Sequence, residues 1–216
     1  MKGVIFDLDG TMVDNMMVHH RAWQKKLKEL GLDMTLEEVR KQIHGINDEI
    51  FIRLFGDRFT VAERKQLAYE KEEAYRAIYK SEIKLIDGLS VFLETLHDRG
   101  VPMAIGSAAP YENVDFVLDK LNLRCYFKTV LHAGDVEKGK PDPEIYLKCA
   151  SGLHLTPEDC VVFEDSPTGA EAAIRAGCKL VIITTTHSQV EFSQFLKVEK
   201  FVPDFRDINW QIFREF

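Results

Sequence analysis

Residues 3–11 read Gly-Val-Ile-Phe-Asp-Leu-Asp-Gly-Thr, a short apolar run that ends in two carboxylates. The run shows no polar alternation, which is typical of a strand buried on both faces of a parallel sheet. Side chains of a strand alternate between its two sides, so Asp7 and Asp9 start out on the same side of the chain. Gly10 allows the backbone to turn there. This stretch predicts a buried first strand with an acidic site at its carboxyl end.

Outward from this strand, further apolar runs are each followed by a turn signal and a stretch with helical spacing. Strands and helices that alternate in this way predict an α/β fold with a doubly wound, Rossmann-like parallel sheet. Asp142 is expected to cap the third helix, with Pro143 in its first turn, and Gly177 to end the fourth. The expected strands are residues 3–6, 102–105, 129–132, 160–163 and 179–183, and the expected helices are residues 89–99, 111–121, 143–151 and 168–176.

One long segment interrupts the alternation. Between residues 15 and 84 apolar residues recur at helical spacing, as at Trp23, Leu27 and Leu30, and we find no strand pattern. The segment is far longer than a crossover connection needs. We therefore expect a helical domain of residues 15–84, inserted into an α/β core domain of residues 1–14 and 85–216.

Composition narrows the classes of function. The chain has 216 residues and a net charge of -7, which argues against a nucleic-acid-binding protein. A carboxylate at position 7 breaks any secretory signal core, and no apolar run is long enough to span a bilayer. The four cysteines form no CxxC pair and are expected to be free, buried thiols in a reducing compartment. We expect a cytoplasmic monomer that binds neither nucleic acid nor membrane.

Polar residues also follow the other expected strands. Ser107 follows the second strand, Lys140 lies in a Gly-Lys-Pro-Asp-Pro loop, and Glu164 and Asp165 follow the fourth strand. Ligand sites of doubly wound sheets lie at these carboxyl ends. A group of carboxylates there is costly without a cation, and carboxylate oxygens suit Mg²⁺. Each residue alone has an ordinary explanation as a turn, cap or surface residue, but their common position favours a site.

These four motifs, in this order, resemble those of the haloacid dehalogenase superfamily. They are Asp-Leu-Asp-Gly-Thr at 7–11, Ser107, Lys140 in Gly-Lys-Pro-Asp-Pro, and Phe-Glu-Asp-Ser at 163–166. The resemblance covers the whole chain, and the inserted helical segment is similar to the cap of this superfamily. Within it, the chain looks most like the phosphatases and phosphohexomutases related to β-phosphoglucomutase. The resemblance also implies a sheet order of 5-4-1-2-3.

The resemblance implies a role for each core residue. Asp7 would be the nucleophile that forms a phospho-aspartate, and Asp9 the general acid and base. Lys140 would stabilise Asp7 and the transferring phosphoryl group, while Ser107 and the Ala108 N–H would hold a phosphate oxygen.

A magnesium ion and a phosphorylated substrate are implied as well. The expected metal ligands are Asp7, the backbone carbonyl of Asp9, Asp165 and, less directly, Glu164. The cap would close over the core and select the leaving group of a small phosphorylated metabolite. The cap residues expected to bind substrate are Asn15, His19, His44, Gly45, Asp48 and Lys71.

The cap sequence separates two reactions that share these motifs. In β-phosphoglucomutase a Lys before the Gly and an Arg soon after it hold the distal phosphate of a sugar bisphosphate. This chain has the partly charged His44 and the anionic Asp48 there, and Asp48 would repel a second phosphate. The sequence therefore favours a sugar-phosphate phosphatase over a phosphohexomutase. A non-enzymatic phospho-aspartate switch is a third hypothesis, against which Asp9 and the long insertion argue.

Overall fold

The computed structural model describes residues 2–43 and 47–210. Its sheet has six parallel strands in the order β3-β2-β1-β4-β5-β6, with β1 at the centre between β2 and β4. The predicted α/β fold is confirmed, and so is the order of its first five strands. The strands are β1 (Gly3–Phe6), β2 (Met103–Gly106), β3 (Phe127–Leu131), β4 (Cys160–Glu164), β5 (Lys179–Ile183) and β6 (Lys200–Val202).

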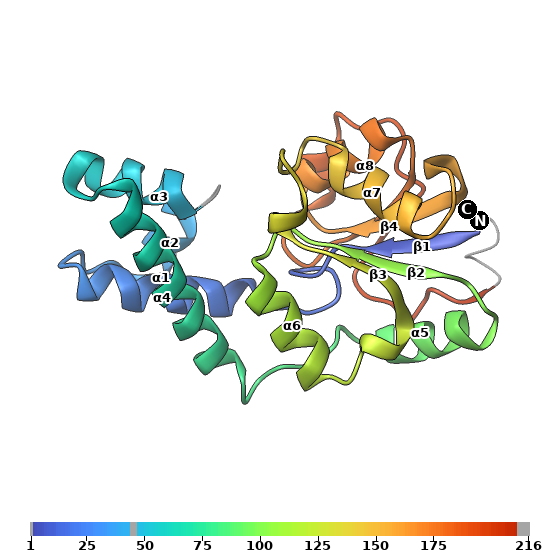
Figure 1. The fold of residues 1–216 in the computed structure, drawn as a ribbon, viewed down its shortest axis with the longest axis horizontal. Coiled ribbons are helices and arrows are strands. Elements are labelled where there is room, and N and C mark those ends of the chain that lie inside the picture. The colour runs from blue at the N-terminus through green and yellow to red at the C-terminus, as the bar shows by residue number, and fades with distance from the viewer. Residues whose placement is uncertain (1, 44–46, 211–216) are drawn as a thin grey trace. The chain divides into compact units, whose positions relative to one another are not determined.

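Helices cover both faces of this sheet, which explains the apolar strands. Every residue of β1, β2 and β4 is buried, because side chains on either side of a parallel sheet meet a helix. In Figure 1, α7 and α8 lie on one side of the sheet and α5 and α6 on the other. The helices are α5 (Leu89–Asp98), α6 (Tyr111–Lys120), α7 (Glu144–Gly152) and α8 (Pro167–Ala176).

The main differences from the predicted core are a sixth strand, the bounds of β3 and the start of α7; the other bounds differ by at most one residue at each end. The sixth strand was not predicted, because three residues carry too little pattern to mark a strand. Strand β3 begins two residues before the expected start and ends before His132. Helix α7 begins at Glu144 with Pro143 as its cap, and Asp142 instead accepts a hydrogen bond from the Glu144 N–H at 3.1 Å. Asp142 still satisfies one of the unpaired N–H groups at this helix start.

The inserted segment is helical, as the spacing predicts. Thr35 and Thr60 each cap a helix in a reciprocal capping box. The buried interior of the segment is formed by Trp23, Leu27, Val39, Ile50 and Phe51. Its helices are α1 (Met16–Glu29), α2 (Leu36–Gln42), α3 (Asn47–Phe55) and α4 (Val61–Tyr79).

Contacts divide the chain into two compact units, one of residues 1–14 and 83–216 and one of residues 15–82. The prediction that these are separate domains, with a boundary at residue 84, stays a prediction. Among the residues described, no helix is both long and apolar enough to cross a membrane. Three cysteines are buried as expected, but Cys125 is exposed, so the expectation of four buried thiols is wrong at that position.

Candidate active site

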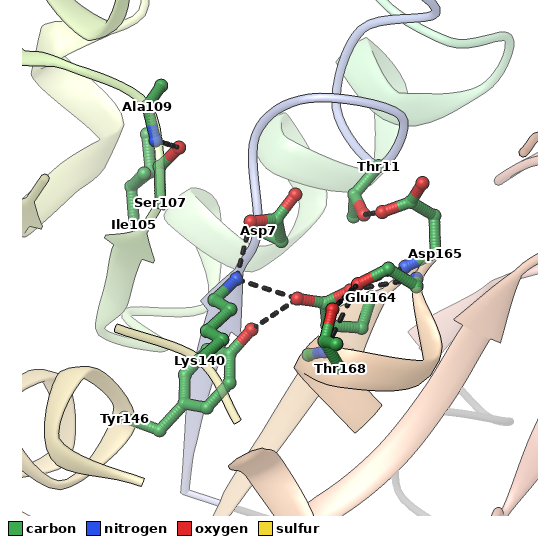
Figure 2. A network of polar contacts seen from close by, with 12 residues as sticks. Asp7, Thr11, Ile105, Ser107, Ala109, Lys140, Tyr146, Glu164, Asp165 and Thr168 are labelled. Atoms are coloured by element: carbon green, nitrogen blue, oxygen red, sulfur yellow. Dashed lines mark hydrogen bonds and ion pairs between the residues drawn. The ribbon is translucent and has the colours of Figure 1, made fainter. Parts of the chain in front are cut away.

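Three strands at the middle of the sheet end at one polar cluster. Asp7 follows β1, Ser107 follows β2, and Glu164 is the last residue of β4, so the sheet order places all three at one edge. The strand order reverses beside β1, because β2 and β3 lie on one side of it and β4 and β5 on the other. Doubly wound sheets form ligand sites at such a point. Lys140 enters the same cluster from the loop before α7 (Figure 2).

The Lys140 ammonium lies between two carboxylates. It donates to Asp7 Oδ1 and to Glu164 Oε1, both at 2.6 Å. All three side chains are less than a tenth exposed. Two hydrogen-bonded contacts fix the loop that carries Lys140. The Glu144 carboxylate accepts hydrogen bonds from the backbone N–H groups of Glu137 and Lys138, and Arg175 donates to the Pro141 carbonyl. The ammonium therefore has a defined position.

Hydrogen bonds to both carboxylate oxygens fix the side chain of Glu164. Its Oε1 accepts from Lys140 and from the Tyr146 hydroxyl at 2.8 Å, while Oε2 accepts from the Asp165 N–H, the Ser166 N–H and the Ser166 hydroxyl. The start of α8 approaches this carboxylate so closely that a Cβ on Gly169 would lie 1.6 Å from Oε1. Glu164 is thus saturated with hydrogen bonds, and position 169 requires glycine.

Asp165 is held by residues of two other loops. Thr11 donates to its Oδ1 at 3.3 Å, and the Thr186 hydroxyl donates to Oδ2. Gly10 lies directly against it at a φ of 80°, and a Cβ there would come within 2.2 Å of Oδ2. Glycine at position 10 therefore permits both the left-handed turn and the close approach of the carboxylate.

The site holds more negative than positive charge. Burial, together with the charges of Glu164 and Asp165, raises the pKa of Asp7 well above its ordinary value despite the opposing Lys140 charge. Burial and the charge of Glu164 raise the pKa of Asp165 to about 8. Burial also works to raise the pKa of Glu164, but Lys140 and the hydrogen bonds outweigh it and lower that pKa. One ammonium does not balance three buried carboxylates.

These carboxylates form a group that fits a metal ion. One oxygen each from Asp7, Glu164 and Asp165 lies within 4.8 Å of the others. A divalent cation would supply the missing positive charge, and hard carboxylate oxygens are the donors that Mg²⁺ takes. The residues present therefore fit the expected metal.

The remaining predicted core residues follow β1 and β2 at the same edge of the sheet. Ser107 is buried and its hydroxyl oxygen accepts from the Ala109 N–H at 3.0 Å, while Ala108 between them is exposed. Asp9 is half-buried in a tight loop in which the Gly10 N–H donates to the Val13 carbonyl at 2.8 Å. Both stand at the carboxyl ends of the strands where the sequence places them.

A family model described as haloacid dehalogenase-like hydrolase matches residues 1–177 of the chain. The protein is a haloacid dehalogenase-like hydrolase. Its membership confirms the resemblance to the superfamily that was drawn from the four motifs, and it confirms that the chain is an enzyme. The hypothesis of a non-enzymatic switch is set aside.

Individual relatives agree with this assignment. The hydrolase is 32% identical to fructose-1-phosphate phosphatase of Escherichia coli, over 83% of this chain and 94% of that protein. It is 29% identical to β-phosphoglucomutase of Bacillus subtilis, over 82% of this chain and 80% of that protein. Its structure is similar to that of a family IA, variant 3 hydrolase from Entamoeba histolytica, with a TM-score of 0.91, 27% identity and coverage of 100% and 98%.

Three predicted cap residues of this hydrolase lie together within the cap. The Asn15 amide donates to the Tyr75 hydroxyl at 2.6 Å, and the His19 ring stacks on the Tyr75 ring at 3.9 Å. The Lys71 ammonium lies 3.1 Å from His19 Nδ1 and donates to Glu72 at 2.8 Å. Whether any of them binds substrate stays a prediction.

Asp48, which was expected to repel a second phosphate, has an ion-pair partner within the cap. Its carboxylate accepts a hydrogen bond from Arg64 Nε at 2.6 Å. The sequence did not reveal this pair, because Arg64 lies sixteen positions away along the chain and the packing of α3 against α4 brings it near. Whether Asp48 faces a substrate stays a prediction. His44 and Gly45 lie outside the described residues.

Sequence reasoning missed several residues of the hydrolase site. Tyr146 and Thr186 donate to its carboxylates but lie outside the four motifs. Ser166 lies in the Phe-Glu-Asp-Ser motif, but no role was predicted for its hydroxyl, which donates to Glu164. Tyr146 and Thr186 gave no distinctive signal, since a tyrosine at a helical core position and a threonine after a strand are ordinary. A signal existed for Gly169, because glycine within a helix is unfavourable unless packing requires it.

Proposed function

We propose that this hydrolase is a Mg²⁺-dependent phosphatase that releases phosphate from small sugar phosphates through a phospho-aspartate on Asp7. The observation that carries the proposal is the Lys140 ammonium held between Asp7 and Glu164 in a buried acidic group. The activities of relatives support the substrate class, since fructose-1-phosphate phosphatase and 6-phosphogluconate phosphatase of Escherichia coli both act on phosphorylated sugars.

Covalent catalysis would proceed in two steps at Asp7. The carboxylate attacks phosphorus, the bond to the leaving oxygen breaks, and Asp9 protonates that oxygen. Asp9 then removes a proton from a water molecule that attacks the phospho-aspartate and releases phosphate. Lys140 would neutralise negative charge on Asp7 and on the phosphoryl group, and the Ser107 hydroxyl with the Ala108 N–H would hold a phosphoryl oxygen.

The proposed metal ligands are Asp7, the Asp9 backbone carbonyl and Asp165, with Glu164 acting less directly. Glu164 takes the indirect role because both of its oxygens are saturated by hydrogen bonds. Bound Mg²⁺ would offset the repulsion between an anionic nucleophile and an anionic phosphate. Thr186 and Thr11 would orient the Asp165 carboxylate for its ligand role.

Charge balance within the cap supports hydrolysis over mutase activity. Lys71 is paired with the buried Glu72, and although burial opposes ionisation of Glu72, the charge of Lys71 lowers the pKa of Glu72 to about 2. Arg64 is paired with Asp48. The charges of these two cap cations are therefore already balanced within the cap, and we propose that a monophosphate with an uncharged leaving group is preferred.

The test is phosphate release from a panel of sugar phosphates, nucleotides and pyrophosphate, measured with and without Mg²⁺. We expect turnover of sugar monophosphates that stops on chelation. The Asp7→Asn variant is the control for phosphate release by a contaminating phosphatase. No Mg²⁺-dependent release from any sugar phosphate would contradict the proposal, and rapid isomerisation of β-glucose 1-phosphate with little free phosphate would favour the phosphohexomutase. A cytoplasmic location and a monomeric state remain predictions from the sequence.

A further inference from the structure

Tyr146 lies on α7 and contacts two charged groups of the site, Glu164 and Lys140. Its side chain is fully buried, and its hydroxyl donates to Glu164 Oε1 at 2.8 Å. Its ring lies 4.9 Å from the Lys140 ammonium. Figure 2 shows Lys140 between this ring and Asp7, with Glu164 beside it.

One carboxylate oxygen links the three residues. Glu164 Oε1 accepts from both Tyr146 and Lys140, and the same ammonium also donates to Asp7. A hydrogen bond from the tyrosine hydroxyl withdraws electron density from Oε1, so that this oxygen attracts the ammonium less strongly. The face of the tyrosine ring is negative and attracts the ammonium from another side. Tyr146 therefore influences how the ammonium is shared between Glu164 and Asp7.

We propose that Tyr146 is a positioning residue, which holds Glu164 and Lys140 so that the Lys140 ammonium stays directed at Asp7. The inference rests on the proposed function, because it assumes that Lys140 supports phosphoryl transfer to Asp7. Tyr146 does not reach the reacting atoms itself, and it acts through its two neighbours. Without the hydroxyl, Oε1 would draw the ammonium toward Glu164 and away from the nucleophile.

Tyr146→Phe tests this with the loss of a single oxygen atom, since the ring and its packing remain. With para-nitrophenyl phosphate as substrate, we expect kcat to fall about tenfold, as for the loss of one hydrogen bond to a charged group. The KM and the Mg²⁺ concentration for half-maximal rate should stay within about twofold, because neither substrate binding nor the metal ligands are touched.

Cys149→Ala is the matched control. Cys149 lies one turn further along α7, is equally buried and donates to the Ile105 carbonyl rather than to the site. We expect this variant to lower the thermal midpoint at least as much as Tyr146→Phe while kcat stays within about twofold of wild type. All rates are measured where circular dichroism shows each variant folded, so that unfolding is not counted as lost kcat.

A double-mutant cycle with Lys140→Met separates positioning from general packing. If Tyr146 acts through Lys140, Tyr146→Phe should lower kcat by less than about twofold in the Lys140→Met background. The same cycle on thermal midpoints in EDTA should be non-additive. The inference is overturned if Tyr146→Phe keeps wild-type kcat, or if it lowers kcat by the same factor in both backgrounds. Absence of Mg²⁺-dependent phosphatase activity in the wild type would instead contradict the proposed function.

Discussion

Lys140→Met removes the positive charge that lies between Asp7 and Glu164 and nearly preserves side-chain length. The ammonium donates at 2.6 Å to each carboxylate. The exposed fractions of the three side chains are 7% for Lys140, 9% for Asp7 and 1% for Glu164, so little water can replace the lost donor. Removing one partner of a buried ion pair costs roughly 3–5 kcal/mol. We expect a loss of unfolding free energy of that size near neutral pH without metal.

The loss should grow as the pH rises. In the wild type, burial works to raise the pKa of Glu164, but Lys140 together with the hydrogen bonds from Ser166 and Tyr146 lowers it. Lys140 also opposes the rise in the pKa of Asp7. Without Lys140, the folded state should bind a further proton at Glu164 and should keep the proton of Asp7 to higher pH, while in the unfolded chain both carboxyls are ionised above about pH 5. The folded state then binds more protons, so its stability falls by up to about 1.4 kcal/mol per pH unit for each extra proton.

Urea unfolding in EDTA at about pH 6 and about pH 9 measures this pH dependence. Lys148→Met is the matched control on α7, where the Lys148 side chain is 46% exposed and pairs with Glu144. We expect the control to lose less than about 1 kcal/mol at either pH. Turnover of Lys140→Met should fall about 10²–10³-fold. An equal stability loss at both pH values, or a loss no larger than that of the control, would refute the charge argument.

Four further predictions concern the nucleophile, the metal and the cap. Asp7→Asn should abolish phosphate release while the protein stays folded, because Lys140 keeps Glu164 as a partner. Release near the wild-type rate would contradict the covalent mechanism. Because the pKa of Asp165 is raised to about 8, Mg²⁺ must displace a proton from this carboxyl below that pH. The Mg²⁺ affinity measured by calorimetry should therefore weaken by up to about tenfold per pH unit between about pH 8 and pH 6. An affinity that does not change over this range would contradict the prediction. Asp165→Ala should weaken Mg²⁺ binding and activity together, with partial recovery at high Mg²⁺. His44→Lys with Asp48→Arg should shift β-glucose 1-phosphate from hydrolysis toward glucose 6-phosphate, and an unchanged product ratio would exclude these positions from contact with a distal phosphate.

The sequence determined the strands and the strand-end residues because their signals are local. A buried strand is a continuous apolar run, and residues 3–6 and 179–183 were predicted with the bounds that the structure has. The rule that parallel strands present their carboxyl ends at one edge then placed Asp7, Ser107 and Glu164 near each other. Helical spacing likewise predicted the inserted segment, because a period near four residues is visible within a few turns.

The tertiary structure alone decided which side chains meet. Lys140 and Asp7 are 133 positions apart, and the motifs suggested their association without giving the shared contact with Glu164. Tyr146 contacts that same carboxylate only because α7 packs against the sheet, and the Asp48–Arg64 pair exists only because α3 packs on α4. Local sequence patterns report backbone conformation and burial, whereas the pairing of buried charges depends on distances across the fold. For that reason the sequence predicted the members of the site, and the structure determined the balance of charge among them.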